Sequence, residues 1–380
     1  MIGDEDGIDI GGMFSREYAE AVAELGRFNL AVFGKTGAGK STLINAVFGQ
    51  VVAPTGTGSP VTADLAFYQH QSGLLGLLDS QGFETGQSGD TVLARLGEIV
   101  TAGRQQSVDR QIHAAWYVLR WSDRRFEQGQ AMFVNRLAEL VPVIVVLTQV
   151  PVAPDGSVHG EALELAAYIE SLGLPIAPSG RVILTNALAD PFLRTPVYGL
   201  QTLIEATFQT APEAARRALS AAQLIDRERK RQACQAIIKK ASTTAVATGV
   251  TPIPFSDAAI LVPLQISMMA KIAAAYGVAL PKSRIASVVG SLMLSSGATS
   301  AGRWLVSSLL RAVPGGQLPA MVISGAVAGS LTSAMGWAWV RVCEYVQEDS
   351  TSGLFDRVVV EQVFRDEFKA RFRLPRGSTS

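Results

Sequence analysis

The first half of the chain alternates short apolar runs with longer stretches whose apolar residues recur at helical spacing. Several of the runs contain β-branched or aromatic residues, which is typical of strands buried on both faces. The runs cover residues 28–33, 65–68, 74–78, 114–119, 143–147 and 181–184. Helices are expected between them at residues 91–104, 127–140, 161–172 and 197–207. This alternation predicts an α/β fold with a doubly wound, mostly parallel sheet.

The second half of the chain has a different pattern. Residues 213–240 are rich in alanine and charged side chains, and they predict one long, solvent-facing helix that joins two halves of the chain. Residues 257–278, 285–302 and 312–340 are then largely apolar. Gly325 and Gly329 have the spacing that lets two helix backbones approach closely. An all-α hydrophobic helical domain is therefore predicted, with an amphipathic helix after it at 357–372.

Composition narrows the classes of function. Charged residues are 17% of the 380 residues and hydrophobic ones 48%, which argues against a disordered chain. Because 33 basic residues balance 33 acidic ones, no nucleic-acid partner is expected. Cys234 and Cys343 form neither a metal-type pair nor a disulfide framework, as in a reducing compartment. The first residues lack the features of a signal peptide, so a cytoplasmic location is expected.

Residues 34–41 read GKTGAGKS and match the pattern G-x-x-x-x-G-K-[ST] of a phosphate-binding loop between a strand and a helix. Its glycines admit the backbone close to a phosphate, and its N–H groups point inward at a helix N-terminus. Lys40 is expected to meet the β- and γ-phosphates, and the Ser41 hydroxyl a Mg²⁺ ion. The other residues expected to contact the nucleotide here are Gly34, Lys35, Thr36, Gly37, Ala38, Gly39 and Thr42.

A second motif, D-x-x-G, follows the apolar run at 74–78. A triphosphate that carries Mg²⁺ needs a carboxylate at the end of a neighbouring strand. Asp79 is expected to join the shell of the ion, and the backbone N–H of Gly82 to contact the γ-phosphate.

Together these two motifs resemble the translation-factor-like GTPases of the Era-like group. The resemblance implies GTP or GDP with Mg²⁺ as ligands, and a switch threonine between the motifs. Thr62 fits that place; it would cap Mg²⁺ and sense the γ-phosphate, and a strand-initiating threonine is the alternative. Lys40, Thr62 and Gly82 are then the candidate catalytic residues.

The base-binding elements depart from the pattern of that group. Pro151 stands where the resemblance places the aspartate that reads guanine, so the choice between GTP and ATP stays open. Asp155 is close enough in sequence to substitute for it. The candidate contacts with the base are Thr148 and Gln149 after the fifth run, and Asn186 and Ala187 after the sixth.

The residue after D-x-x-G also departs from the pattern. It is Phe83, whereas Ras-like enzymes have a glutamine that orients the attacking water. Slow intrinsic hydrolysis is therefore expected unless another group or a partner protein supplies that function. Arg124 and Arg125 are candidates to stabilise charge, and the alternative, which the sequence favours, is that they are surface arginines or salt-bridge partners.

The second half resembles the YcjF-like helical domain of unknown function, which is often joined to a GTPase of this type. Residues 252–257, 261–265 and 268–277 carry the resemblance. It implies a bacterial GTPase that is in part associated with membranes. A soluble helical bundle, a peripheral membrane contact and a membrane-spanning segment all stay open.

The expected organisation has five parts. They are an N-terminal segment (1–26), a P-loop GTPase domain (27–210), a connecting helix (211–245), an apolar helical domain (246–350), and a C-terminal helix and tail (351–380). The favoured function is a nucleotide switch with slow, Mg²⁺-dependent GTP hydrolysis, which directs the helical domain towards a membrane surface or a protein effector. A homodimer, and a peripheral position at the inner face of the plasma membrane, stay open. The alternatives are an ATP-using P-loop enzyme and a non-hydrolysing nucleotide-binding scaffold.

Overall fold

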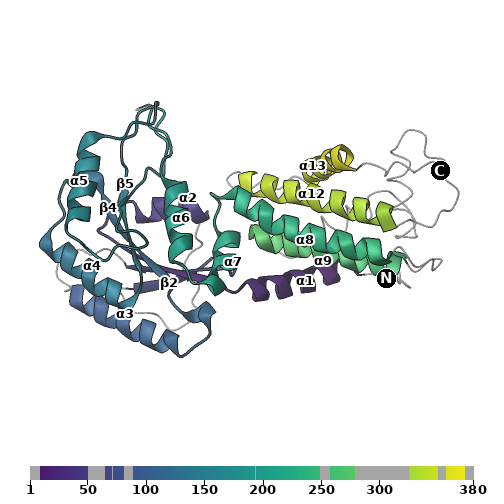
Figure 1. Cartoon of the computed structure of the whole chain (residues 1–380), viewed down its shortest axis with the longest axis horizontal. Helices are drawn as coiled ribbons and strands as arrows, with labels where there is room; N and C mark the ends of the chain where they lie inside the picture. The colour runs from purple at the N-terminus through teal and green to yellow at the C-terminus, as the bar shows by residue number, and fades with distance from the viewer. Residues whose placement is uncertain are drawn as a thin grey trace, which may run out of the picture. The chain divides into compact units, whose positions relative to one another are not determined.

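The computed structural model describes residues 9–49, 65–70, 72–80, 89–192, 194–248, 257–278, 325–349 and 357–372, and all structural statements concern these residues. The chain divides into two compact units (Figure 1). The sheet unit is Leu25–Arg227, and the helical unit combines Met1–Glu24 with Glu228–Ser380.

The sheet unit is built on six strands in the order β2-β3-β1-β4-β5-β6. Neighbouring strands are parallel except for β2 and β3, which are antiparallel. The strands are β1 (Phe28–Phe33), β2 (Leu65–Gln69), β3 (Leu75–Ser80), β4 (Ala114–Arg120), β5 (Val143–Thr148) and β6 (Ile183–Leu184). The predicted doubly wound, mostly parallel sheet is confirmed.

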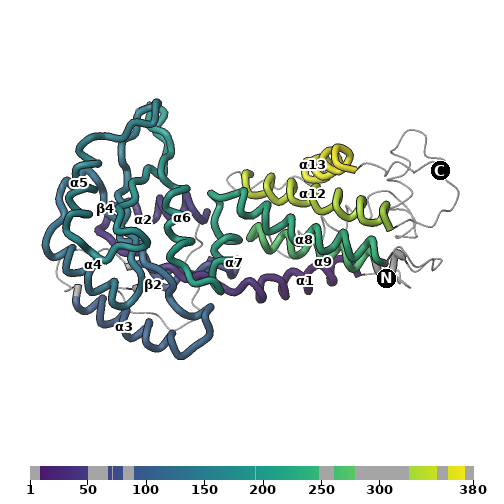
Figure 2. Tube along the Cα trace, in the orientation of Figure 1, coloured from purple at the N-terminus to yellow at the C-terminus, as the bar shows by residue number. Residues whose placement is uncertain are grey.

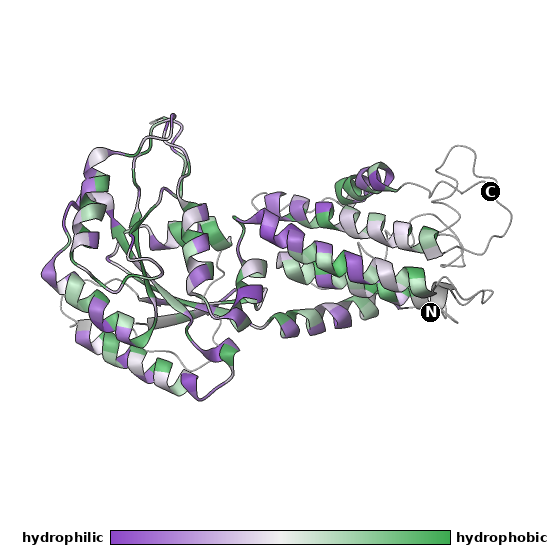
Figure 3. Ribbon diagram, viewed as in Figure 1, coloured by the Kyte–Doolittle hydropathy of each residue, from purple (hydrophilic) through white to green (hydrophobic). Residues whose placement is uncertain are grey.

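Helices cover both faces of this sheet (Figure 1). They are α2 (Lys40–Phe48), α3 (Gly89–Arg104), α4 (Gln128–Leu140), α5 (Gly160–Ser171), α6 (Leu200–Thr210) and α7 (Glu213–Ala222), with short 3₁₀ turns at Val108–Arg110 and Trp121–Asp123. Because side chains alternate along a strand, neighbouring residues of β4 face opposite layers. Tyr117 packs on Phe133 of α4, whereas Trp116 stacks on Phe48 of α2 and donates a hydrogen bond to Thr207 of α6. In Figure 3 the strands are mostly green and α3 and α4 mix green with purple, as expected of a buried sheet under amphipathic helices.

The helical unit contains α1 (Ile10–Leu25), α8 (Arg227–Thr248), α9 (Asp257–Tyr276), α12 (Gly325–Asp349) and α13 (Arg357–Arg371). The trace in Figure 2 shows α1, from the N-terminal end of the chain, alongside α9. The Tyr18 hydroxyl donates to the Val278 carbonyl at 2.9 Å, and Phe14 meets Trp339 edge to face. The segment before the sheet therefore packs with helices that follow it by more than 200 residues in sequence.

The predicted single connecting helix is wrong, because the structure has two helices, α7 and α8, with a break between them. The buried side chain of Gln223 stabilises the break: its Oε1 accepts hydrogen bonds from the N–H groups of Ile225 and Asp226. The expectation that this region faces solvent holds for most charged residues of α8, which are exposed, but the helix also has a buried face that includes Cys234 and Ile238. The many charged residues of α8 made its apolar face hard to recognise in the sequence.

The two glycines at the start of α12 allow α8 to approach closely, as their spacing predicts. A Cβ atom on Gly325 would lie 2.4 Å from the Val246 carbonyl oxygen, and one on Gly329 would lie 2.5 Å from the Val246 side chain. The predicted apolar stretch at 285–302 lies outside the described residues. Among the helices described, none has both the length and the apolar character needed to cross a bilayer.

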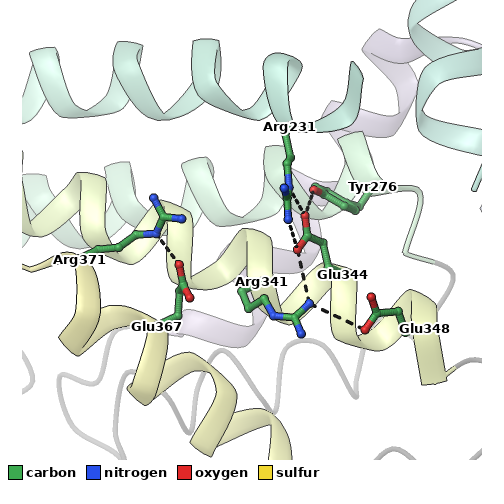
Figure 4. Close-up of polar contacts among 7 residues, drawn as sticks. All are labelled: Arg231, Tyr276, Arg341, Glu344, Glu348, Glu367 and Arg371. Atoms are coloured by element: carbon green, nitrogen blue, oxygen red, sulfur yellow. Dashed lines mark hydrogen bonds and ion pairs between the residues drawn. The ribbon is translucent and has the colours of Figure 1, made fainter. Parts of the chain in front are cut away.

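A polar cluster joins α8, α9 and α12 inside the helical unit (Figure 4). Glu344 is 3% exposed and accepts two hydrogen bonds from Arg231, at 2.6 and 3.0 Å, and one from the Tyr276 hydroxyl at 3.0 Å. Burial raises the pKa of Glu344, but these donors and Arg341 outweigh burial and lower it overall. Lys230 is fully buried and donates to the Tyr276 carbonyl at 3.0 Å. Burial lowers the pKa of Lys230 to about 7.

Candidate functional site

The loop between β1 and α2 depends on glycine for its path. Gly34, Gly37 and Gly39 have φ angles of +146°, +79° and +86°, which favour glycine. A Cβ atom on Gly34 would also lie 2.2 Å from the Val118 carbonyl oxygen of β4. A side chain at Gly34 would therefore collide with β4, and the positive φ at all three positions favours glycine. The loop leads directly into the first turn of α2.

Lys40 is the first residue of α2, and it folds back across the loop. Its side chain is buried, and Nζ donates to the carbonyl oxygens of Gly34 at 2.8 Å and Lys35 at 3.2 Å. The first N–H groups of α2 have no acceptor within the helix, and they carry its positive dipole end. The ammonium group and these N–H groups make the loop a site for an anion. Lys35, Thr36, Ser41 and Thr42 are exposed.

Asp79 lies at the end of β3, where its backbone is paired with Val32 of β1. Its Oδ1 atom is buried and has no hydrogen-bond partner among the described residues. Burial raises the pKa of Asp79, and the charge of Lys40 partly offsets this. An unpaired buried carboxylate oxygen fits a hydrated Mg²⁺ ion, which takes one or two protein oxygens and the phosphates of its ligand. The other oxygen predicted to contact Mg²⁺ is the Ser41 hydroxyl, which is exposed on the second residue of α2. Both contacts with Mg²⁺ stay predictions.

The end of β5 contacts the loop. The Thr148 hydroxyl is hydrogen-bonded to the carbonyl oxygens of Ala38 at 2.5 Å and Leu119 at 3.1 Å. Gln149 has a left-handed backbone, with φ of +57°, and its Nε2 donates to the Gly37 carbonyl at 3.3 Å. These two side chains therefore hold successive carbonyls of the loop, a contact that the sequence analysis missed. The contacts with a base predicted for them stay a prediction.

A loop begins at the end of β6, and hydrogen bonds from the side chain of Asn186 close it. Asn186 is nearly buried, and its Nδ2 donates to the carbonyls of Leu188 at 2.9 Å and Pro196 at 2.7 Å. The Asn186 backbone pairs with Tyr198 across the same loop. Ala187 is half-buried beside it. The contact with a base predicted for both residues stays a prediction.

Five further candidates are engaged elsewhere or lie outside the described residues. Asp155 accepts hydrogen bonds from the Ser157 hydroxyl and N–H, which lower its pKa, and it lies in a tight turn after β5. Arg124 forms an ion pair with Glu161 at 2.6 Å and lies over the Trp121 ring, as the alternative reading expects. The candidates outside the described residues are Thr62, Gly82 and Phe83.

The described site thus combines a glycine-rich loop at a helix N-terminus, a lysine at its centre and an unpaired carboxylate on the neighbouring strand. This fold and site define a P-loop nucleotide-binding domain. Residues 29–149 match the family described as "50S ribosome-binding GTPase", and residues 213–367 match the "Domain of unknown function (DUF697)". The chain is therefore a P-loop GTPase domain followed by a DUF697 domain, as the resemblance predicted.

One curated relative shares part of the sequence. This chain is 32% identical to "Magnetosome membrane protein 22" of Magnetospirillum gryphiswaldense over 106 residues, which are 28% of the chain. The match covers 54% of that protein, so the chain spans about half the length of this relative.

Proposed function

We propose that the protein binds GTP with Mg²⁺, hydrolyses it slowly, and acts as a nucleotide switch. The observation that carries the proposal is Lys40, which is buried at the centre of the loop next to the N-terminus of α2. Its ammonium group exchanges the Gly34 and Lys35 carbonyls for oxygens of the β- and γ-phosphates. Residues 29–149 match a GTPase family, and this match supports guanine as the base.

Mg²⁺ would be held by Ser41 and Asp79 together with Thr62, and Gly82 would contact the γ-phosphate. The ion supplies positive charge against the phosphates. The chain's own part is to hold the polyphosphate with the N–H groups of the loop and the ammonium group of Lys40. The γ-phosphate then orders the segments around Thr62 and Gly82, which is the switching step.

Slow hydrolysis follows from two features. Phe83 has no polar atom with which to orient water. Arg124 is paired with Glu161, so it does not supply positive charge to the phosphates. We expect phosphate release above that of the Lys40→Ala variant; release no higher would favour a non-hydrolysing scaffold.

The helical unit is the proposed output of the switch, and its partner is a membrane surface contacted from one side. The similarity to a magnetosome membrane protein favours a membrane over a protein effector. Flotation of the full chain with liposomes in GTP and in GDP tests this, and binding that depends on the nucleotide is expected. The absence of binding in both states would contradict the membrane contact.

Calorimetry with GTP and Mg²⁺ tests the nucleotide site itself. Replacing Lys40 with Ala removes the ammonium group that meets the phosphates, and the expected loss of affinity is about 100-fold, since hydrogen bonds to charged groups each contribute about 1.5–3 kcal/mol. Lys35→Ala is the matched control, because this exposed lysine in the same loop contributes only its backbone carbonyl. Equal affinity of the Lys40→Ala and Lys35→Ala variants would contradict the proposal.

A further inference from the structure

Polar side chains that follow β5 and β6 are already engaged within the protein. We infer that the site selects its ligand by the polyphosphate and accepts adenine as well as guanine, with a preference of about tenfold or less. The inference rests on the proposed function, because it concerns the base of the same nucleotide. It depends on where the hydrogen-bonding groups of two loops, 149–159 and 185–199, are directed.

Backbone pairing closes the first loop at the position that would read the base. The Val150 N–H donates to the Thr185 carbonyl at 3.1 Å, and the His159 N–H donates to the Pro151 carbonyl at 3.0 Å. Val152 pairs with Val158 across the same loop. Pro151 itself has no N–H group and no polar side-chain atom. Position 151 therefore offers guanine no side-chain acceptor.

The only carboxylates in the two loops close their own turns. Asp155 Oδ1 accepts from the Ser157 N–H at 2.9 Å and hydroxyl at 2.7 Å, and Asp190 Oδ1 accepts from the Phe192 N–H at 2.8 Å. Guanine presents two adjacent donors on its Watson–Crick edge, and a carboxylate is the group that matches both. Without one, the edge that distinguishes guanine from adenine is not read by a charged acceptor.

Donors at the ends of the two strands are likewise hydrogen-bonded to other parts of the sheet unit. The Thr148 hydroxyl and the Gln149 Nε2 contact the phosphate loop, and the Asn186 Nδ2 contacts the Leu188 and Pro196 carbonyls. A site that is built to hydrogen-bond its ligand can reject an analogue by 10⁴–10⁵, whereas a site without that contact rejects it only weakly. The described residues fit the second kind of site.

Gln149 is thereby assigned as a positioning residue for the phosphate loop. Its Nε2 donates to the Gly37 carbonyl of the loop at 3.3 Å. Loss of its side chain should loosen the loop for every nucleotide in equal measure. The ratio of the GTP and ATP affinities distinguishes this role from reading the base, which a single affinity does not.

Calorimetry of the full chain against GTP and against ATP, each with Mg²⁺, tests the inference. Affinities within about tenfold of each other are expected. If GTP binds tightly and ATP binds at least 100-fold more weakly, the inference is overturned and the proposed function still stands. If neither nucleotide binds, both the inference and the proposed function are wrong.

Two variants sharpen the test without relying on the native protein alone. Gln149→Ala should weaken GTP and ATP by the same factor, and a loss confined to GTP would overturn the inference. Pro151→Asp, compared with Pro151→Asn, should raise the ratio of GTP to ATP affinity at least tenfold, since it supplies the absent carboxylate. An unchanged ratio would show that the base does not lie against position 151, and this result would also overturn the inference.

A third variant addresses the nearest carboxylate directly. Asp155→Asn keeps the shape of the turn and removes its charge, so the ratio of the two affinities should stay the same. If the ratio fell towards ATP, Asp155 would be reading guanine, and the inference would be wrong. Circular dichroism of each variant confirms that the comparison is made between folded proteins.

Discussion

The two units each bury carboxylate oxygens, Asp79 in the sheet unit and Glu344 in the helical unit, and these two side chains are partnered in opposite ways. At the edge of the sheet unit, the buried Oδ1 of Asp79 has no hydrogen-bond partner among the described residues, and Lys40 Nζ donates to the Gly34 and Lys35 carbonyls. In the helical unit, Glu344 accepts hydrogen bonds at both oxygens, and Lys230 and Tyr276 are bonded across helices. Unpaired polar atoms cost stability and are suited to a ligand, whereas paired ones stabilise the fold. The comparison teaches that the Asp79 carboxylate is suited to a ligand, whereas the Glu344 carboxylate stabilises helix packing.

The largest effect on stability is expected from Glu344→Ala. This change leaves Arg231 and the Tyr276 hydroxyl without their acceptor. Breaking a fully buried pair costs about 3–5 kcal/mol, and because the Arg231 side chain is half exposed we expect about 2–3 kcal/mol. Urea unfolding measures the loss, and the affinity for GTP should stay the same.

The matched control is Glu348→Ala on the same helix. Glu348 is 38% exposed and lies 3.8 Å from Arg341, a surface pair expected to contribute less than about 0.5 kcal/mol. If the Glu344→Ala variant lost affinity for GTP while its stability was unchanged, the division between binding and packing would be wrong.

Lys230 should make stability depend on pH. Its pKa is about 7 in the folded protein, against an ordinary value of 10.5. Between these values the unfolded chain binds the proton more tightly, so the free energy of unfolding rises with pH. Integrating the slope of 1.36 kcal/mol per pH unit from pH 7 to about 8.5 gives a rise of about 1.5 kcal/mol. Above that range, burial raises the pKa of Cys234 to about 12, which opposes the rise.

Urea midpoints measured across this range check the prediction. The Lys230→Met variant, which keeps an unbranched side chain without the charge, should show no such rise. The same slope in both proteins would mean that another group is responsible and that Lys230 is not the buried cation of the helical unit.

A smaller effect is expected from Asp79→Asn, this time on binding. The amide cannot supply the charge that attracts Mg²⁺, so the gain in GTP affinity on adding Mg²⁺ should fall by about tenfold. Stability should not fall, because burial already raises the pKa of Asp79 and disfavours its charged form.

Asp90→Asn is the control, since this carboxylate is 73% exposed and pairs with Arg136 on the surface. Its Mg²⁺ dependence should match that of the native protein. An Asp79→Asn variant with an undiminished response to Mg²⁺ would remove Asp79 from the binding edge.

The smallest effect is expected from Arg124→Ala. The side chains of Arg124 and Glu161 are 64% and 46% exposed, so their ion pair should contribute less than about 0.5 kcal/mol. Phosphate release from GTP should stay the same. A tenfold fall in that rate would instead show that Arg124 leaves Glu161 to stabilise charge on the phosphates.

Much of the fold could be predicted because its determinants are local. Each strand is a short apolar run, and the loop at Gly34 carries its own glycines and lysine. The contacts of Thr148 with Ala38, 110 residues earlier in the chain, depend on how β5 and the loop meet in space, and no local pattern reports that. The break at Gln223 was missed for a related reason: side-chain hydrogen bonds to Ile225 and Asp226 end a helix that composition would continue.

The central claim is that the loop at 34–41 holds the polyphosphate of a nucleotide. A crystal structure with a non-hydrolysable GTP analogue and Mg²⁺ tests it most directly. We expect the β-phosphate among the N–H groups of that loop, with Lys40 Nζ moved from the Gly34 and Lys35 carbonyls onto phosphate oxygens. A structure in which Lys40 stays on those carbonyls while the analogue binds elsewhere would contradict the account.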